Sequence, residues 1–187
     1  LSVILASSKS WGIKLNDLFL ALLLKTFEPL RDHRAYSSRR RQFSLGTIVN
    51  IRRDMNVDSH GTFGLFLGSF VVTHKVPENI SLKTLATDVH RQTKAIKKRR
   101  SYMGTAIDLI SAQRSLRVLS MERKKKFYQK HYPLWGGVTN MNLNSIWSQT
   151  GESKPVNYFR AVSTGPATPL VMSITTVRDI VNIGMSY

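Results

Sequence analysis

The five histidines are the first residues to consider for chemistry, because a positioned imidazole is the commonest general base in enzymes. They stand at positions 33, 60, 74, 90 and 131, and none is followed by an aspartate four residues later. His74 has Glu78 at that spacing, but Pro77 lies between the two. We therefore predict that each histidine is a surface or strand-edge residue rather than a catalytic one.

Other recognisable reaction centres are missing from the sequence. No cysteine occurs, which excludes a thiol nucleophile, a disulfide framework and a cysteine zinc site. The glycine-rich loops that bind nucleotide phosphates, the HExxH zinc motif and the GxSxG nucleophile motif do not occur either. We expect no metal and no covalently bound cofactor.

Charge is the most unusual feature of the composition. The 187 residues include 28 Lys and Arg against 11 Asp and Glu, a net charge of +17. Such a field attracts anions of any kind, including nucleic acid, phosphate-bearing cofactors, acidic membranes and acidic proteins. The basic runs at 94–100 and 122–126 fall on helix faces and helix ends, where solvated cations are ordinary. Since only Phe127 and Tyr128 stand beside a basic run, we expect nucleic acid to bind non-specifically.

The compartment is indicated only indirectly. The lack of cysteine fits a reducing environment, and we expect the protein in the cytoplasm, with peripheral attachment to a membrane left open. The apolar run at 18–24 is far shorter than the roughly 20 residues that span a bilayer. The sequence begins at Leu1 and shows no signal peptide, so we expect an excised piece of a longer chain.

The elements that must position the polar residues alternate between helix and strand. Asn16 or Asp17 can cap a helix whose residues 18–24 are apolar on nearly all sides, which predicts a helix buried on most of its surface. Glu28-Pro29 ends it. Further helices are predicted at 81–98, 105–119 and 120–132, and strands at 43–54, 61–76 (after a glycine-rich turn), 134–147, 156–164 and in a hairpin at 170–187 that turns near Arg178 and Asp179. This order predicts an α/β (α+β) fold in which a mixed β-sheet is flanked by helices.

Three segments, in this order, resemble the condensation-like, CoA-dependent acyltransferase superfamily, which has the chloramphenicol acetyltransferase fold. NDLFLALLLKTF (16–27) resembles its helix that opens on Asn-Asp, VNIRRD (49–54) with GTFGLFLGSF (61–70) resembles its V-N/S-x-R strand and continuation, and GGVTNMNLNS (136–145) resembles its late Ser/Thr-Asn strand. The superfamily includes peptide-synthetase condensation domains, alcohol acetyltransferases and wax-ester synthases. Two departures concern Gly61-Thr62, where the family has Gly-Asn, and Met141-Asn142, where many wax-ester synthase relatives have Gly-Pro.

The resemblance implies that residues 1–187 are the C-terminal subdomain of such an enzyme, truncated at both ends. The family's His-His-x-x-x-Asp motif, whose second histidine is the general base, lies in the N-terminal half and does not occur here. The implied parent enzyme moves an acyl group from a CoA or carrier-protein thioester to an alcohol or amine. Its co-substrate would be acyl-CoA or a phosphopantetheine thioester. We expect this chain alone to be inactive, and its partners to be the missing N-terminal half and acyl-CoA or an acyl carrier protein.

The same resemblance implies roles for five residues. Thr139 and Asn140 would lie on a strand near the catalytic histidine, where the Asn140 amide could hydrogen-bond substrate or a developing oxyanion, the alternative being a cross-strand hydrogen bond. Asn16 and Asp17 would shape one end of the substrate tunnel, with helix capping as their alternative. Arg52 would anchor a structural ion pair.

A different class of function stays open, namely a non-catalytic basic module that binds nucleic acid or an acidic protein partner. The parent reading frame separates the two hypotheses, because only the acyltransferase requires a His-His-x-x-x-Asp motif upstream. If this chain is half of an enzyme, we expect an exposed apolar seam where the other half docks, and self-association of the isolated chain. The run at 18–24 and the strands around 63–72 are predicted to form that seam.

Overall fold

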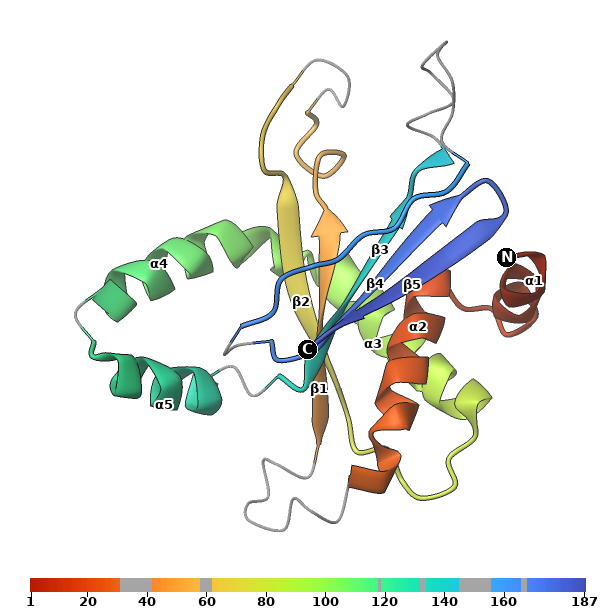
Figure 1. Ribbon diagram of the computed structural model, residues 1–187, viewed down its shortest axis with the longest axis horizontal. Coiled ribbons are helices and arrows are strands. Elements are labelled where there is room, and N and C mark those ends of the chain that lie inside the picture. Colours follow the sequence, from red (N-terminus) through yellow and green to blue (C-terminus); the bar gives the residue numbers. More distant parts are fainter. Residues whose placement is uncertain (31–41, 58–61, 118, 132–133, 145–155, 166–167) are drawn as a thin grey trace.

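In the part of the chain that the structure describes, five strands form one mixed sheet with helices against it (Figure 1). The computed structural model describes residues 1–30, 42–57, 62–117, 119–131, 134–144, 156–165 and 168–187. The helices are α1 (Ser2–Ser10), α2 (Leu15–Thr26), η1 (Glu28–Leu30), α3 (Leu82–Arg99), η4 (Ser101–Gly104), α4 (Thr105–Arg117) and α5 (Met121–His131), where η marks a short 3-10 helix. The strands are β1 (Phe43–Asn50), β2 (Leu67–His74), β3 (Gly136–Asn142), β4 (Val171–Val177) and β5 (Ile180–Ser186). The predicted α/β class is confirmed.

The strands follow the order β2-β1-β3-β4-β5 across the sheet. Strand β1 pairs antiparallel with β2, and β4 pairs antiparallel with β5, whereas β3 lies parallel to both β1 and β4. Parallel neighbours need long crossover connections, and the chain between β2 and β3 supplies α3, α4 and α5. The predicted C-terminal hairpin is confirmed, and Arg178 takes the left-handed conformation at its turn, with φ 51°.

Helix α2 is buried on almost every side, as its sequence predicts. Leu20 and Leu24 have no exposed surface, and only Leu22 of the apolar run is substantially exposed, at 38%. The helix contacts α3 as well as β1 and β3. The expectation that this run forms an exposed seam is therefore wrong, because the chain's own sheet and α3 already cover it. None of the described helices combines the length and the apolar character needed to cross a membrane.

Exposed apolar side chains gather elsewhere. The Phe63 ring is fully exposed and Leu65 is 82% exposed, just before β2. Helix α4 also presents apolar residues to solvent, namely Ile107, Leu109 and Ile110. Within the range 63–72, Phe63, Leu65, Leu67 and Val71 are exposed as expected, whereas Phe70 and Val72 are buried. A partner that covers the exposed residues remains a prediction.

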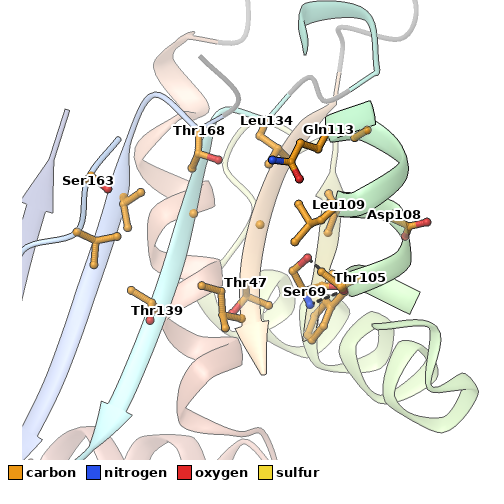
Figure 2. Close-up of a pocket in the computed structure, with 18 of the residues that line it drawn as sticks. Thr47, Ser69, Thr105, Asp108, Leu109, Gln113, Leu134, Thr139, Ser163 and Thr168 are labelled. Atoms are coloured by element: carbon orange, nitrogen blue, oxygen red, sulfur yellow. Dashed lines mark hydrogen bonds between the residues drawn. The ribbon is translucent and has the colours of Figure 1, made fainter. Parts of the chain in front are cut away.

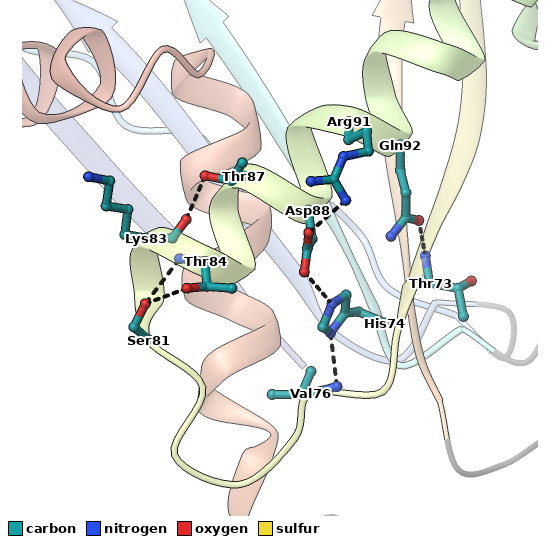
Figure 3. Close-up of polar contacts among 10 residues, drawn as sticks. All are labelled: Thr73, His74, Val76, Ser81, Lys83, Thr84, Thr87, Asp88, Arg91 and Gln92. Carbon is teal, nitrogen blue, oxygen red and sulfur yellow. Dashed lines mark hydrogen bonds and ion pairs between the residues drawn. The ribbon is translucent and has the colours of Figure 1, made fainter.

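Helix α3 begins where its sequence predicts and protects the edge of the sheet. The Ser81 hydroxyl oxygen accepts the Thr84 N–H at 3.1 Å, which caps the first turn. Further along, Gln92 Oε1 accepts the Thr73 N–H of edge strand β2 at 3.3 Å. Figure 3 shows both contacts. Since an unpaired edge strand invites association with another chain, this side-chain bond partly blocks that edge.

Two elements differ from the sequence-based predictions. The pattern at 156–164 predicts a strand, but this segment is an irregular extended stretch beside β4 and β5. Side chains hold it there: Ser173 Oγ donates to the Arg160 carbonyl at 2.7 Å, and Asn182 Nδ2 donates to the Tyr158 carbonyl at 3.0 Å. Helix α1 is not predicted at all, because serines interrupt its apolar pattern and no side chain caps its start. The basic loop predicted at 31–41 lies outside the described residues.

The orientation of α2 can be tested with two matched substitutions. Leu20→Ala should lower the free energy of unfolding by roughly 2–5 kcal/mol, because it removes buried methyl groups and leaves a cavity. Leu22→Ala, the same change at the exposed position of the same helix, should cost less than about 1 kcal/mol. Urea unfolding followed by circular dichroism measures both values. Equal losses in the two variants would contradict the described burial of α2.

Candidate functional site

The residues predicted to contact substrate lie on two different faces of the sheet. Side chains alternate between faces along a strand, and Val138 of β3 belongs to the core that contains α2. Asn140 therefore faces the α2 side, whereas Thr139 faces away from it. On the α2 side, Asn16 Nδ2 donates to Thr47 Oγ1 at 3.4 Å. The structure thus separates Thr139 from the other candidates.

Asp17 is a buried carboxylate, only 1% exposed, in the first turn of α2. Its Oδ2 lies 2.6 Å from His90 Nδ1 and accepts the Lys14 N–H at 3.3 Å, so Asp17 does help to satisfy the helix start. Its Oδ1 accepts the Thr93 hydroxyl at 2.8 Å. A buried carboxylate needs such partners, because removing it from water otherwise destabilises its charged form. Asp17 therefore joins the start of α2 to the middle of α3.

The environment of His90 differs from the surface position predicted for it. The His90 side chain is 24% exposed and pairs with a buried carboxylate. An imidazole held in this way at Nδ1 is the arrangement seen in many general bases. Here the pair connects two helices, and we interpret it as structural. The sequence carried a signal for it, since His90 and Thr93 share the α3 stripe that buries Ala86 and Val89.

His74 behaves as a strand-edge histidine, as predicted. Its Nδ1 accepts the Val76 N–H at 2.9 Å, and its Nε2 lies 3.5 Å from Asp88 Oδ2 (Figure 3). Asp88 also pairs with Arg91 at 3.0 Å on the exposed side of α3. Because Nδ1 is occupied as an acceptor, the neutral ring carries its proton on Nε2, toward Asp88. These contacts fix the end of β2 against α3.

The described contacts of Arg52 are an aromatic ring and a backbone carbonyl. Its guanidinium carbon lies 4.7 Å from the centre of the Phe66 ring, and its Nη2 donates to the Gly64 carbonyl at 3.3 Å. Among the described residues, no carboxylate lies within ion-pair distance of Arg52. Stacking on an aromatic ring and a hydrogen bond thus give Arg52 a structural role, which fastens the segment before β2 to the end of β1.

On the face of the sheet away from α2, a cavity of about 970 Å³ opens between the strands and α4 (Figure 2). Its floor lacks side chains where Gly46 of β1 and Gly137 of β3 stand side by side in the sheet register. A Cβ atom at Gly46 would lie 3.4 Å from Leu134, and one at Gly137 would lie 3.3 Å from Thr168. Leu134 and Thr168 thus lie over the two glycines, and a larger residue at either position would have to displace them.

Aliphatic side chains form most of the cavity wall. They are Ile48, Val71, Leu109, Ile110, Leu116, Leu134, Val162 and Val171. Ile48 is 49% exposed and Leu109 is 60% exposed, so the cavity is open to solvent. Its volume lies in the range of roughly 300–1,000 Å³ in which proteins bind small molecules and cofactors.

Hydrogen bonds at its first turn hold α4 over the cavity. Thr105 Oγ1 accepts the Ser69 N–H at 2.8 Å and donates to the Tyr102 carbonyl at 2.7 Å. The Tyr102 hydroxyl in turn donates to Asp54 Oδ2 at 3.0 Å. Burial, followed by the hydrogen bond to Asp54, raises the pKa of Tyr102 above its ordinary value of 10.0. The start of α4 is therefore fixed to the edge of the sheet.

Polar groups in the cavity are distributed unevenly. Arg117 and Lys124 line it where α4 ends, and Asp108 lines it near the start of the same helix. In the sheet, Thr139 Oγ1 accepts a hydrogen bond from Arg160 Nη2 at 3.2 Å. Because arginine only donates, the Thr139 hydroxyl keeps its own proton for an acceptor in the cavity. The cavity therefore offers an apolar body, a cationic end and a hydroxyl donor.

Comparisons with known proteins assign no family to this geometry. A scan against protein-family models and a search of the curated proteins give no match to the chain. Within the described residues, no group of three or more His, Cys, Asp or Glu side chains could hold a metal ion. The cavity and its polar groups thus define the candidate site.

The structural role of Asp17 leads to a stability prediction. Asp17→Asn should lower the free energy of unfolding by roughly 1–3 kcal/mol, because an amide cannot satisfy all three donors at a buried position. Asp88→Asn, at a carboxylate on α3 that is 30% exposed, should cost at most about 1 kcal/mol. A double-mutant cycle of Asp17→Asn with His90→Gln should show coupling of about 0.5–3 kcal/mol. Additive effects would mean that the two side chains do not interact.

The raised pKa of Tyr102 predicts weaker stability in alkaline solution. The folded state binds the Tyr102 proton more tightly than the unfolded chain does, so this contribution is complete below pH 10.0 and is lost as the pH rises through the folded-state pKa. Tyr102→Phe removes this titration while keeping the ring in place. Melting temperatures measured from about pH 8 to about pH 11 should therefore fall more steeply for the unmodified protein than for the variant. Parallel profiles would argue against the described burial.

Proposed function

We propose that this chain is the C-terminal half of an acyltransferase that moves an acyl group from a CoA or carrier-protein thioester to an alcohol or amine. The observation that carries the proposal is the apolar cavity of about 970 Å³ with Thr139 in its wall. An acyl chain is aliphatic and requires an apolar site, and the mixed sheet with flanking helices is consistent with a chloramphenicol acetyltransferase-like half-domain.

The proposal divides the chemistry between two halves. A histidine of the N-terminal half would take the proton from the attacking hydroxyl or amine, which is ordinary general-base catalysis. The present half would supply the acyl pocket and a hydrogen-bond donor. Thr139 is suited to that role because Arg160 Nη2 also holds its backbone carbonyl, at 3.2 Å, which fixes the residue. A fixed hydroxyl aimed at a reacting carbonyl stabilises the negative charge that develops there.

Asn140, Asn16 and Asp17 would contribute differently from Thr139. They lie on the α2 side of the sheet, so in this proposal they support the strand and helix that border the site. The co-substrate would be acyl-CoA or a phosphopantetheine thioester, and the partners would be the N-terminal half and the thioester carrier. A cytoplasmic enzyme, with or without peripheral contact to a membrane, fits these partners.

A non-catalytic basic module is the competing function. Exposed cations follow the end of α3, at Lys97, Lys98, Arg99 and Arg100, and others lie on α5. They belong to separate elements of the fold. Such a surface predicts salt-sensitive anion binding without sequence preference. Strong preference for one nucleic-acid sequence at high salt would favour this competing function over the transferase.

The transferase proposal predicts activity only when the two halves are combined. The chain alone, incubated with acyl-CoA and a panel of alcohols and amines, should release no CoA above the buffer rate. Coexpression with the preceding segment of its reading frame, about 150–200 residues or one domain, should give turnover. Thr139→Val in that assembly should lower kcat by about a hundredfold, the scale reported for an oxyanion donor.

Controls make this experiment decisive. Thr73→Val changes a hydroxyl on β2 that bonds to Ser44 at 3.1 Å, outside the cavity, and should leave kcat unchanged. Turnover by the isolated chain would contradict the proposal, because it would place the reacting groups within these residues. An upstream segment without the His-His-x-x-x-Asp motif would contradict it as well.

A further inference from the structure

The shape, lining and charge of the cavity under α4 indicate the kind of molecule that it binds. We propose that it binds a flexible aliphatic chain with an anionic head group, the chain lying along the sheet and the head at Arg117 and Lys124. The inference is separate from the transferase assignment, which places the thioester carbonyl at Thr139, whereas Arg117 and Lys124 line the cavity where α4 ends.

The cavity is elongated. The lining residues include both the first and the last residue of α4, Thr105 and Arg117. A helix of 13 residues is about 20 Å long, so the cavity runs a comparable distance. Figure 2 shows its labelled residues spread along the strands, from Thr139 at one end to Leu134 and Gln113 at the other. This shape fits an extended chain.

The wall of the cavity is mainly aliphatic. Phe70 is the one aromatic residue among the described lining residues, and the rest of the apolar wall is aliphatic. Aromatic or heterocyclic ligands are usually held by ring stacking, which this wall does not offer. The exposed aliphatic groups of Ile48, Val71 and Leu109 would be removed from water by a bound chain, which is the main driving force for such binding.

Charged residues are unevenly placed around the cavity. Arg117 and Lys124 come from α4 and α5, and neither has a carboxylate partner among the described residues. Asp108 stands at the opposite end of the cavity, so an anionic head is attracted at one end and repelled at the other. Charged hydrogen bonds from a guanidinium and an ammonium group to a carboxylate or phosphate are among the strongest available. The cavity thus specifies both the type of ligand and its direction.

Binding can be measured on the chain as it is, without any transfer reaction. Isothermal titration calorimetry with dodecanoate should show binding of one molecule per chain. Dodecyltrimethylammonium, with the same chain and a cationic head, should bind at least about tenfold more weakly. Equal affinity for the two ligands would contradict a cationic head-group end of the cavity.

Matched variants test separately the head-group end of the cavity and the part that holds the aliphatic chain. The double variant Arg117→Gln with Lys124→Gln should weaken dodecanoate binding by at least about tenfold. The control Arg114→Gln with Arg123→Gln removes the same charge from exposed positions on the same two helices outside the cavity, and should change affinity less than about twofold. Gly46→Val adds a branched side chain to the cavity floor, where a Cβ already lies 3.4 Å from Leu134, and should abolish binding. Ile48→Trp fills the same space from an exposed position, should the first variant fold poorly.

Three results would overturn the inference. Equal losses in the two double variants would show a general charge effect and no head-group site. Binding that survives in folded Gly46→Val and Ile48→Trp proteins would place the chain elsewhere. A dimer seen by sedimentation, together with no binding of dodecanoate by calorimetry, would show that a second copy of the chain covers the cavity instead.

Discussion

The burial of α2 is the constraint on which the rest of the structure depends. A helix with Leu18 to Leu24 apolar on nearly all sides cannot lie at a surface, so it has to contact both the sheet and α3. Asp17 enters the core with it, and the carboxylate is tolerated only because His90 and Thr93 of α3 meet it. The position of α3 relative to the sheet is thus fixed twice, by apolar packing and by one buried polar cluster.

Helices α2 and α3 cover one face of the sheet, and α4 and the segment at 156–165 lie over the other. These two segments cover the second face only in part. Helix α4 is fastened mainly at its start, through Thr105, and its apolar residues Ile107 and Leu109 stay exposed. Below it, Gly46 and Gly137 add no side chains to the sheet, and Leu134 and Thr168 lie over them. The cavity therefore arises because the two faces of the sheet are covered differently. Helix α2 packs closely against one face, whereas α4 is held to the other face mainly at its start.

Much of the fold could be predicted from the sequence, and the reasons are local. The all-round apolar run before Pro29, the Ser81 cap and the hairpin at Arg178 each carry a signal within a few residues. The segment at 156–164 has the alternation of a strand but is held by side chains of its neighbours, which no local pattern reveals. The candidate site was harder to predict from the sequence than the fold. Thr139 could be selected from the chain, but the Gly46–Gly137 floor and the Asp17–His90 pair exist only because the fold brings distant residues together.

Methyl NMR tests most directly whether the cavity between α4 and the sheet binds an aliphatic chain. In protein with isotope-labelled Ile, Leu and Val methyl groups, saturating dodecanoate should give nuclear Overhauser contacts from its chain to Ile48, Val71 and Leu109. The buried methyl groups of Leu20 and Leu24, on the other face of the sheet, should show none. Contacts to these core residues, or chain contacts confined to the exposed region around Phe63, would contradict the account.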